Sequence, residues 1–167
     1  MEFVLDPPYG IGPLRLGLTA DEARTALAFL GPLPANPTGG LMIHRPSGLS
    51  LGVGFGAGPT SGRVNAIEAG RPDSPGDTVT FRNVNLFELP ALTVVERLSE
   101  HARWTPDDDG FVANDLFLAL WRPFAADDDP DEEEGYYFQS VLVARPGYND
   151  TPAEAAARAA AGQPPGY

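Results

Sequence analysis

Carboxylates are the most concentrated chemical groups in this 167-residue chain, and they cluster in one segment. Residues 105–134 hold 11 of the 23 acidic residues and only one of the 11 basic residues, so this segment has a net charge of −10. The rest of the chain has a net charge of −2. A dense group of carboxylates attracts cationic partners over long range, and it can also hold a divalent cation. Binding of a cationic partner and binding of a metal ion are therefore the two kinds of chemistry that this segment suggests.

The acids form two runs, and tyrosines follow the second run. Residues 107–109 precede Gly110, and the second run lies between two apolar segments. We predict that the second run and its tyrosines contact a basic protein partner; these residues are Asp127, Asp128, Asp129, Asp131, Glu132, Glu133, Glu134, Tyr136 and Tyr137. A solvated, solubilising loop is the alternative. If residues 111–121 form one strand, the two runs lie at opposite ends of the sheet.

The acidic runs do not match a known calcium loop. With Gly110 at loop position 6 of an EF-hand, Leu116 occupies position 12, where calcium requires a bidentate glutamate. Cysteine is absent, so thiolate metal sites, disulfides and cysteine nucleophiles are excluded. We therefore predict no metal site and no cofactor.

Alternating glycines mark a second candidate site. Gly52, Gly54 and Gly56 alternate with apolar residues, and their spacing matches no phosphate-binding loop. The pattern predicts a strand with one apolar face and one bare face. A bare face can pack closely against a helix or form a ligand face. A small-ligand-binding protein or enzyme that uses residues 52–56 is thus the alternative to a protein-binding module. A structural or assembly subunit is a third alternative.

Catalytic patterns are missing from the chain. His44 and His101 are the only histidines, and the sequence has neither a GxSxG nor a HExxH motif. We predict a non-enzymatic protein with no catalytic residue. The net charge of −12 argues against nucleic-acid binding. The longest apolar run, residues 116–121, is too short to span a membrane, and the first residues lack a secretion signal. We expect a cytoplasmic protein without membrane contact.

Periodicity predicts an α+β fold. Thr19 and Glu22 form a capping box for a helix over residues 19–30, and Pro90 begins a second helix over residues 90–101. Short turns separate seven predicted strands, at residues 41–44, 49–55, 63–68, 78–81, 111–113, 116–121 and 136–144. We expect one antiparallel sheet of about six or seven strands with both helices on one face. The strands at 116–121 and 136–144 are apolar on both faces, which predicts that they lie at the centre.

The order of elements favours a tandem duplication. An apolar strand leads into a helix, and about three strands follow, once in each half of the chain. We assign residues 1–150 to a single domain. Residues 151–167 are expected to form an alanine-rich surface helix and a flexible tail.

Residues 11–23, which read IGPLRLGLTADEA and precede a helix that ends at Gly31, resemble the opening of the β-lactamase-inhibitory protein family. Related small outer-membrane-assembly lipoprotein domains share this opening. The resemblance implies helices with antiparallel sheet in a tandem repeat, and it implies an inhibitor that binds an enzyme. It carries over no binding residues. Together with the acidic segment, it favours an immunity or inhibitor protein that binds a basic partner.

Overall fold

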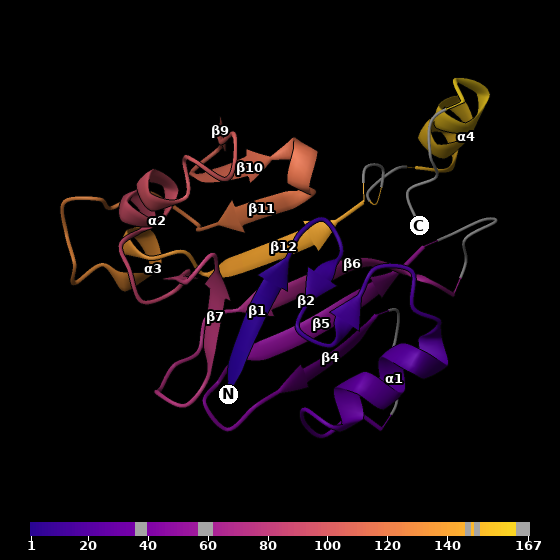
Figure 1. The fold of residues 1–167 in the computed structure, drawn as a ribbon, viewed down its shortest axis with the longest axis horizontal. Helices are drawn as coiled ribbons and strands as arrows, with labels where there is room; N and C mark the ends of the chain where they lie inside the picture. Colours follow the sequence, from indigo (N-terminus) through magenta and orange to yellow (C-terminus); the bar gives the residue numbers. More distant parts are fainter. Residues whose placement is uncertain (36–39, 57–61, 146–147, 149–150, 163–167) are drawn as a thin grey trace.

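The computed structural model describes residues 1–35, 40–56, 62–145, 148 and 151–162. Within these residues, strands and helices form an α+β fold with two sheets, which confirms the predicted fold class. Strands β1 (Glu2–Asp6) and β7 (Thr78–Phe81) of one sheet lie in front of the strands of the other sheet (Figure 1). Buried residues from both sheets belong to one hydrophobic core, so the sheets pack against each other.

The larger sheet has seven strands, and every pairing in it is antiparallel. Its order is β4 (Leu41–His44), β5 (Ser50–Phe55), β6 (Val64–Gly70), β12 (Ser140–Ala144), β11 (Leu118–Trp121), β10 (Gly110–Ala113) and β9 (Thr105–Asp107). The predicted antiparallel sheet is therefore confirmed. Strand β12 occupies the centre and β11 lies beside it, because their inward side chains are apolar enough for the most buried positions.

The smaller sheet has the order β3 (Leu14–Arg15), β2 (Gly10–Ile11), β1, β7 and β8 (Val84–Asn85). Here the expectation of a single sheet was wrong, because β7 pairs with β1 instead of joining the larger sheet. The β1–β7 pairing is parallel. The sequence did not indicate β1, which is only five residues long and ends just before Pro7. Its alternation is nevertheless clear in the structure, where Phe3 and Leu5 are buried and Val4 is exposed.

Helix α1 (Ala20–Ala28) begins at the predicted capping box. The Thr19 hydroxyl accepts a hydrogen bond from the Glu22 amide at 3.2 Å, and the Glu22 carboxylate accepts one from the Thr19 amide at 3.0 Å. Helix α2 (Ala91–Arg97) starts directly after Pro90. Both helices are shorter than expected, and both contribute buried residues to the core between the sheets. The alanine-rich segment forms helix α4 (Pro152–Ala160), and residues 163–167 lie outside the described residues.

The predicted duplication appears in the topology. Strands β2 and β3 form a hairpin that leads into α1 and then into β4, β5 and β6. Strands β7 and β8 form an equivalent hairpin that leads into α2 and then, after β9, into β10, β11 and β12. In the smaller sheet, the hairpin β2–β3 and the hairpin β7–β8 lie on opposite sides of β1. In the larger sheet, β4, β5 and β6 lie on one side in the order in which β10, β11 and β12 lie on the other, so these six strands are symmetric about the β6–β12 pair. The two halves therefore repeat one arrangement.

Two predicted strands are shorter in the structure. Asn114–Leu116 form a 3₁₀ turn, and Phe117 adopts a left-handed conformation with a φ of 55°, so β11 begins only at Leu118. Residues 136–139 were expected to be extended. Instead, Glu133–Tyr136 form the short helix α3, and β12 begins at Ser140. Apolar runs of this length do not distinguish a strand from a turn of helix.

Candidate functional site

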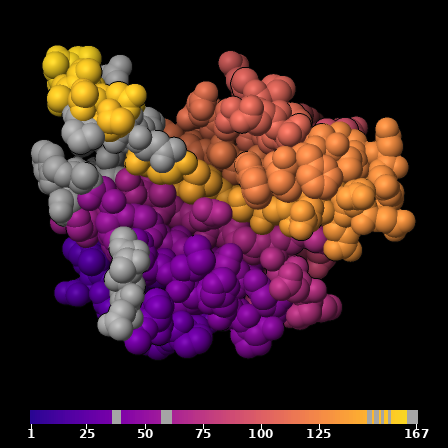
Figure 2. Space-filling model, turned by 180° about the vertical axis from the view of Figure 1, so that it is seen from behind, coloured from indigo at the N-terminus to yellow at the C-terminus, as the bar shows by residue number. Residues whose placement is uncertain are grey.

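The two acidic runs meet at one end of the molecule. The turn at residues 114–117 reverses the chain, so β10 and β11 form a hairpin in which Phe111 pairs with Leu120. Asp109 and Arg122 therefore lie side by side. The runs were expected at opposite ends of the sheet only if residues 111–121 formed one strand, and the turn shows that this condition is not met. Figure 2 shows the orange segment around α3 gathered at this end.

Arg122 is the buried centre of this acidic end, and it is only 4% exposed. Its Nε donates to the Asp109 carbonyl at 2.7 Å, and its Nη1 donates to the Asp127 carboxylate at 2.6 Å and to the Gly135 carbonyl at 2.7 Å. The guanidinium also lies 5.9 Å from the ring centroid of Phe138. A planar group with several fixed donors is suited to join separate segments in this way. Arg122 thereby holds both acidic runs together.

A second arginine fixes the helix that carries the last acids. Arg71 pairs with Glu133 at 3.4 Å and lies 4.5 Å above the ring of Tyr137. Tyr136 packs edge-on against Tyr137 with their ring centroids 5.0 Å apart. Both tyrosines are half-buried. Tyr136 and Tyr137 therefore pack beside the acidic end, and each ring has a contact within the chain.

The structure divides the seven predicted acidic contact residues into two groups. Asp127 and Glu133 form ion pairs within the chain and position the turn. The other five are exposed and form no ion pair with a described residue; they are Asp128, Asp129, Asp131, Glu132 and Glu134. We call these five residues the exposed acids. Their positions are set by the scaffold beneath them, although they make few contacts of their own.

The outer face of the seven-stranded sheet, on the side away from β1, is the second candidate surface. Strand register places Met42, Gly52, Glu68, Leu142 and Ala119 in one row across five adjacent strands. Their chain neighbours point inward to the core. Figure 2 views the molecule from this side. The bare glycine face predicted from the sequence is part of this outer face.

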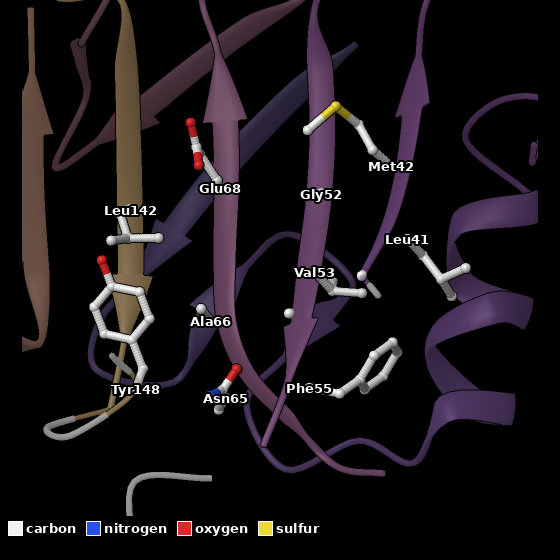
Figure 3. Close-up of a pocket in the computed structure, with 12 residues that line it drawn as sticks. Leu41, Met42, Gly52, Val53, Phe55, Asn65, Ala66, Glu68, Leu142 and Tyr148 are labelled. Atoms are coloured by element: carbon white, nitrogen blue, oxygen red, sulfur yellow. The ribbon is translucent and has the colours of Figure 1, made fainter. Parts of the chain in front are cut away.

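A concavity of about 660 Å³ lies on this face over the glycines (Figure 3). Gly52 and Gly54 line it, whereas Gly56 does not. Its apolar sides include Met42, Leu142 and Tyr148. A second concavity, of about 440 Å³, shares Leu142 and Tyr148 and continues toward β10. The structure thus brings together two of the three predicted glycines in an open hollow.

Sequence reasoning missed Asn65, which lines the same concavity. Phe55 pairs with Val64, but Gly54 pairs with Ala66, so Asn65 is an extra residue in a β-bulge. Such bulges redirect side chains. Asn65 is 6% exposed, and its side chain forms no hydrogen bond with a described residue. Its Oδ1 would lie 3.2 Å from a Cβ placed on Gly54, which locates the carboxamide on the outer face. A polar residue that interrupts the apolar run of this strand was the available signal.

The clearest pKa shift belongs to a buried group with several partners. A hydrogen bond from Arg45 lowers the pKa of Asp77 from 3.8 to about 2, with a further hydrogen bond from Ser47 and against the opposing effect of burial. Arg45 Nε donates to Asp77 at 2.9 Å, and Arg45 Nη1 donates to the Leu30 carbonyl at 2.6 Å. The carboxylate is already satisfied within the chain. This cluster therefore ties the β4–β5 hairpin to the start of β7 and is not an open site.

The two histidines lie in separate parts of the described chain. His44 lies on β4, His101 follows α2, and neither side chain hydrogen-bonds to a described residue. Among the described residues, no three histidine, aspartate or glutamate side chains are grouped as metal ligands would be. No helix in the described ranges is long and apolar enough to cross a membrane.

Comparisons with protein-family models, with curated proteins and with solved structures found no match for this chain.

Proposed function

We propose that the protein is a non-enzymatic binding module that docks a basic protein partner through its acidic end. The finer proposal is an immunity or inhibitor protein that covers a cationic surface of an enzyme or toxin. The observation that supports it is the convergence of both acidic runs on the buried Arg122. The exposed acids are thereby presented together on a fixed turn, where their fields add toward an approaching cation.

An aromatic side chain beside the acids supports the same proposal. Trp121 is 53% exposed, directly precedes Arg122, and pairs with Ser140 on the outer face of the sheet. Large aromatic residues contribute much of the energy at protein interfaces, and charged residues around them set the partner and the association rate. Trp121 therefore gives the acidic end an apolar anchor that a solubilising loop does not need.

The test compares two variants with the same change of charge. The first neutralises the exposed acids to Asn or Gln and keeps Asp127 and Glu133, so that the ion pairs of the turn remain. The control neutralises five exposed acids elsewhere: Glu2, Asp21, Glu88, Glu96 and Glu100. Each protein is used to capture partners from a lysate of the source cell. The captured protein is then identified, purified and titrated against each variant at low and high salt.

We expect a basic partner whose affinity falls at least tenfold in the first variant and hardly changes in the control. High salt should weaken binding to the wild type and remove most of the difference between the variants. Equal binding by both variants, or a captured partner without a basic surface, would contradict the proposal. Thermal unfolding of all three proteins checks that the fold is intact.

The outer-face concavity favours a second candidate, a small-ligand-binding protein. About 660 Å³ is within the usual size range of ligand sites. A small-molecule library is added to the ¹⁵N-labelled protein, and shifts of the Gly52 and Gly54 amide signals in the NMR spectrum test this candidate directly.

A further inference from the structure

We propose that the concavity over Gly52 and Gly54 receives one arginine or lysine side chain of the partner, with Glu68 pairing its charge and Asn65 pairing the adjoining peptide group. This inference rests on the proposed function, because it assigns a second contact to the same basic partner. It concerns different residues from the acidic end, so the two can be tested separately.

The floor of the concavity admits a chain or side chain directly against the sheet. Gly52 and Gly54 have no side chains. Between Asn65 and Glu68 on β6, Ala66 contributes one methyl group. A Cβ on Gly52 would already lie 3.3 Å from the terminal methyl of Met42. The hollow therefore exists because these two positions are glycine. Larger residues there would fill it.

The charge of the concavity specifies a cation. Glu68 is the only charged side chain among its described lining residues, and it forms no hydrogen bond or ion pair with a described residue. Figure 3 shows its carboxylate on β6, between Leu142 on β12 and Met42 on β4. Lysine and arginine lay their aliphatic stems along apolar surface and keep the charged end at a polar group. The apolar sides of the concavity match the aliphatic stem of such a side chain, and the Glu68 carboxylate matches its charged end.

Asn65 specifies the second part of the ligand. The Asn65 side chain lines the concavity and has no hydrogen-bond partner among the described residues, and its carboxamide offers both a donor and an acceptor. A peptide group offers the complementary pair. Asn65 and Glu68 are three residues apart on β6, a span on the order of 10 Å. That span is comparable with an arginine residue measured from its backbone amide to its guanidinium.

Continuity of the surface indicates that the cation belongs to the partner protein. Leu142 lines the concavity, Ser140 is two residues away on β12, and Ser140 pairs with Trp121 beside the acidic end. All three residues lie on the outer face. A partner held by the exposed acids and Trp121 would therefore also lie over Glu68.

The probe is the peptide acetyl-Ala-Arg-Ala-amide, titrated into the ¹⁵N-labelled full chain at millimolar concentration. The matched probe replaces arginine with citrulline, which has nearly the same shape and no charge. We expect saturable shifts of the Gly52 and Gly54 amides and of the Asn65 side-chain NH₂ with the arginine peptide. The citrulline peptide should bind at least tenfold more weakly.

Three variants connect the binding to the proposed contacts. Glu68→Gln should lower the affinity for the arginine peptide at least fivefold. Glu100→Gln makes the same charge change on another surface and should leave this affinity unchanged. Gly52→Val should abolish binding by filling the floor. The amide spectrum of each variant shows whether the variant is folded. Glu68→Gln changes only an exposed side chain. This variant therefore still tests the inference if Gly52→Val does not fold.

Several results would overturn the inference. These are equal binding of the two peptides, no effect of Glu68→Gln, or shifts confined to the acidic end. Equally tight binding of free argininamide would indicate a small-molecule cation instead of a partner side chain. If neutralising the exposed acids removes partner binding and Glu68→Gln does not, the concavity inference fails and the proposed function stands. If Glu68→Gln removes partner binding and neutralising the exposed acids does not, docking through the acidic end is refuted and the concavity inference stands.

Discussion

Arg122 Nη1 forms an ion pair with Asp127 Oδ1 at 2.6 Å across the turn that follows β11, and this ion pair gives the acidic segment a defined structure. The arginine side chain is 3% exposed and the aspartate side chain 32% exposed. The same guanidinium also binds backbone carbonyls of both neighbouring turns. Repulsion between the many carboxylates is therefore opposed by one central cation.

Replacing Arg122 with Leu should lower the free energy of unfolding by about 3–5 kcal/mol, because three buried or partly buried acceptors lose their donor. Arg15, which pairs with Asp6 at 2.6 Å on the surface, is the control. Arg15→Leu should cost less than about 1 kcal/mol, since water replaces an exposed pair easily. Urea unfolding measures both values. Similar losses for the two variants would show that Arg122 does not organise the acidic end.

Asp77 should make stability depend on pH in a defined window. Its pKa is lowered from 3.8 to about 2 in the folded state, so its contribution is fully present above about pH 4 and is lost as the pH falls toward 2. The shift corresponds to about 2 kcal/mol. Asp77→Asn should therefore be less stable than the wild type by roughly that amount at pH 7. Near pH 2 the two proteins should unfold at nearly the same urea concentration, and a constant difference across this range would contradict the assignment.

The two faces of the larger sheet should respond differently to truncation. Leu120 on β11 points into the core and is 2% exposed, whereas Leu142 on the neighbouring strand points to the outer face and is half-buried. Leu120→Ala should cost about 2–5 kcal/mol of unfolding free energy. Leu142→Ala should cost less than about 1.5 kcal/mol. Equally large losses would indicate that something covers the outer face.

Trp121 should report partner binding without contributing much to the fold. The chain has two tryptophans, and Trp104→Phe leaves Trp121 as the only one. That replacement should be well tolerated, because the buried Trp104 Nε1 lacks a hydrogen-bond partner among the described residues. In this variant, adding the purified partner should shift the emission to shorter wavelength and reduce quenching by iodide. Unchanged quenching in a saturated complex would place Trp121 outside the interface.

Trp121→Ala then measures the contribution of the ring. We expect at least a tenfold loss of affinity for the partner, since exposed aromatic residues at interfaces contribute strongly. The unfolding free energy should change by less than about 1 kcal/mol because the side chain is more than half exposed. A large loss of stability with unchanged affinity would assign Trp121 a structural role.

Local patterns predicted the elements well where one period or one cap was clear. Thr19 and Glu22 identified the start of α1, and the apolar runs identified β11 and β12 as neighbours at the centre of a sheet. The boundaries were less accurate around Phe117, whose left-handed backbone lies inside the apolar run 116–121 and delays the start of β11 to Leu118. The turn that includes Phe117 decided the relative position of the two acidic runs.

The sequence by itself determined the α+β class, the capped first helix, the bare glycine strand and the localisation of the charge, because periodicity, capping and composition act between near neighbours in the chain. Only the tertiary structure decided that β1 and β7 form a second sheet and that both acidic runs surround Arg122. It also decided that a β-bulge directs Asn65 into the concavity. These relationships depend on strand register and chain reversal, which bring together residues whose separation in the sequence carries no sign of contact.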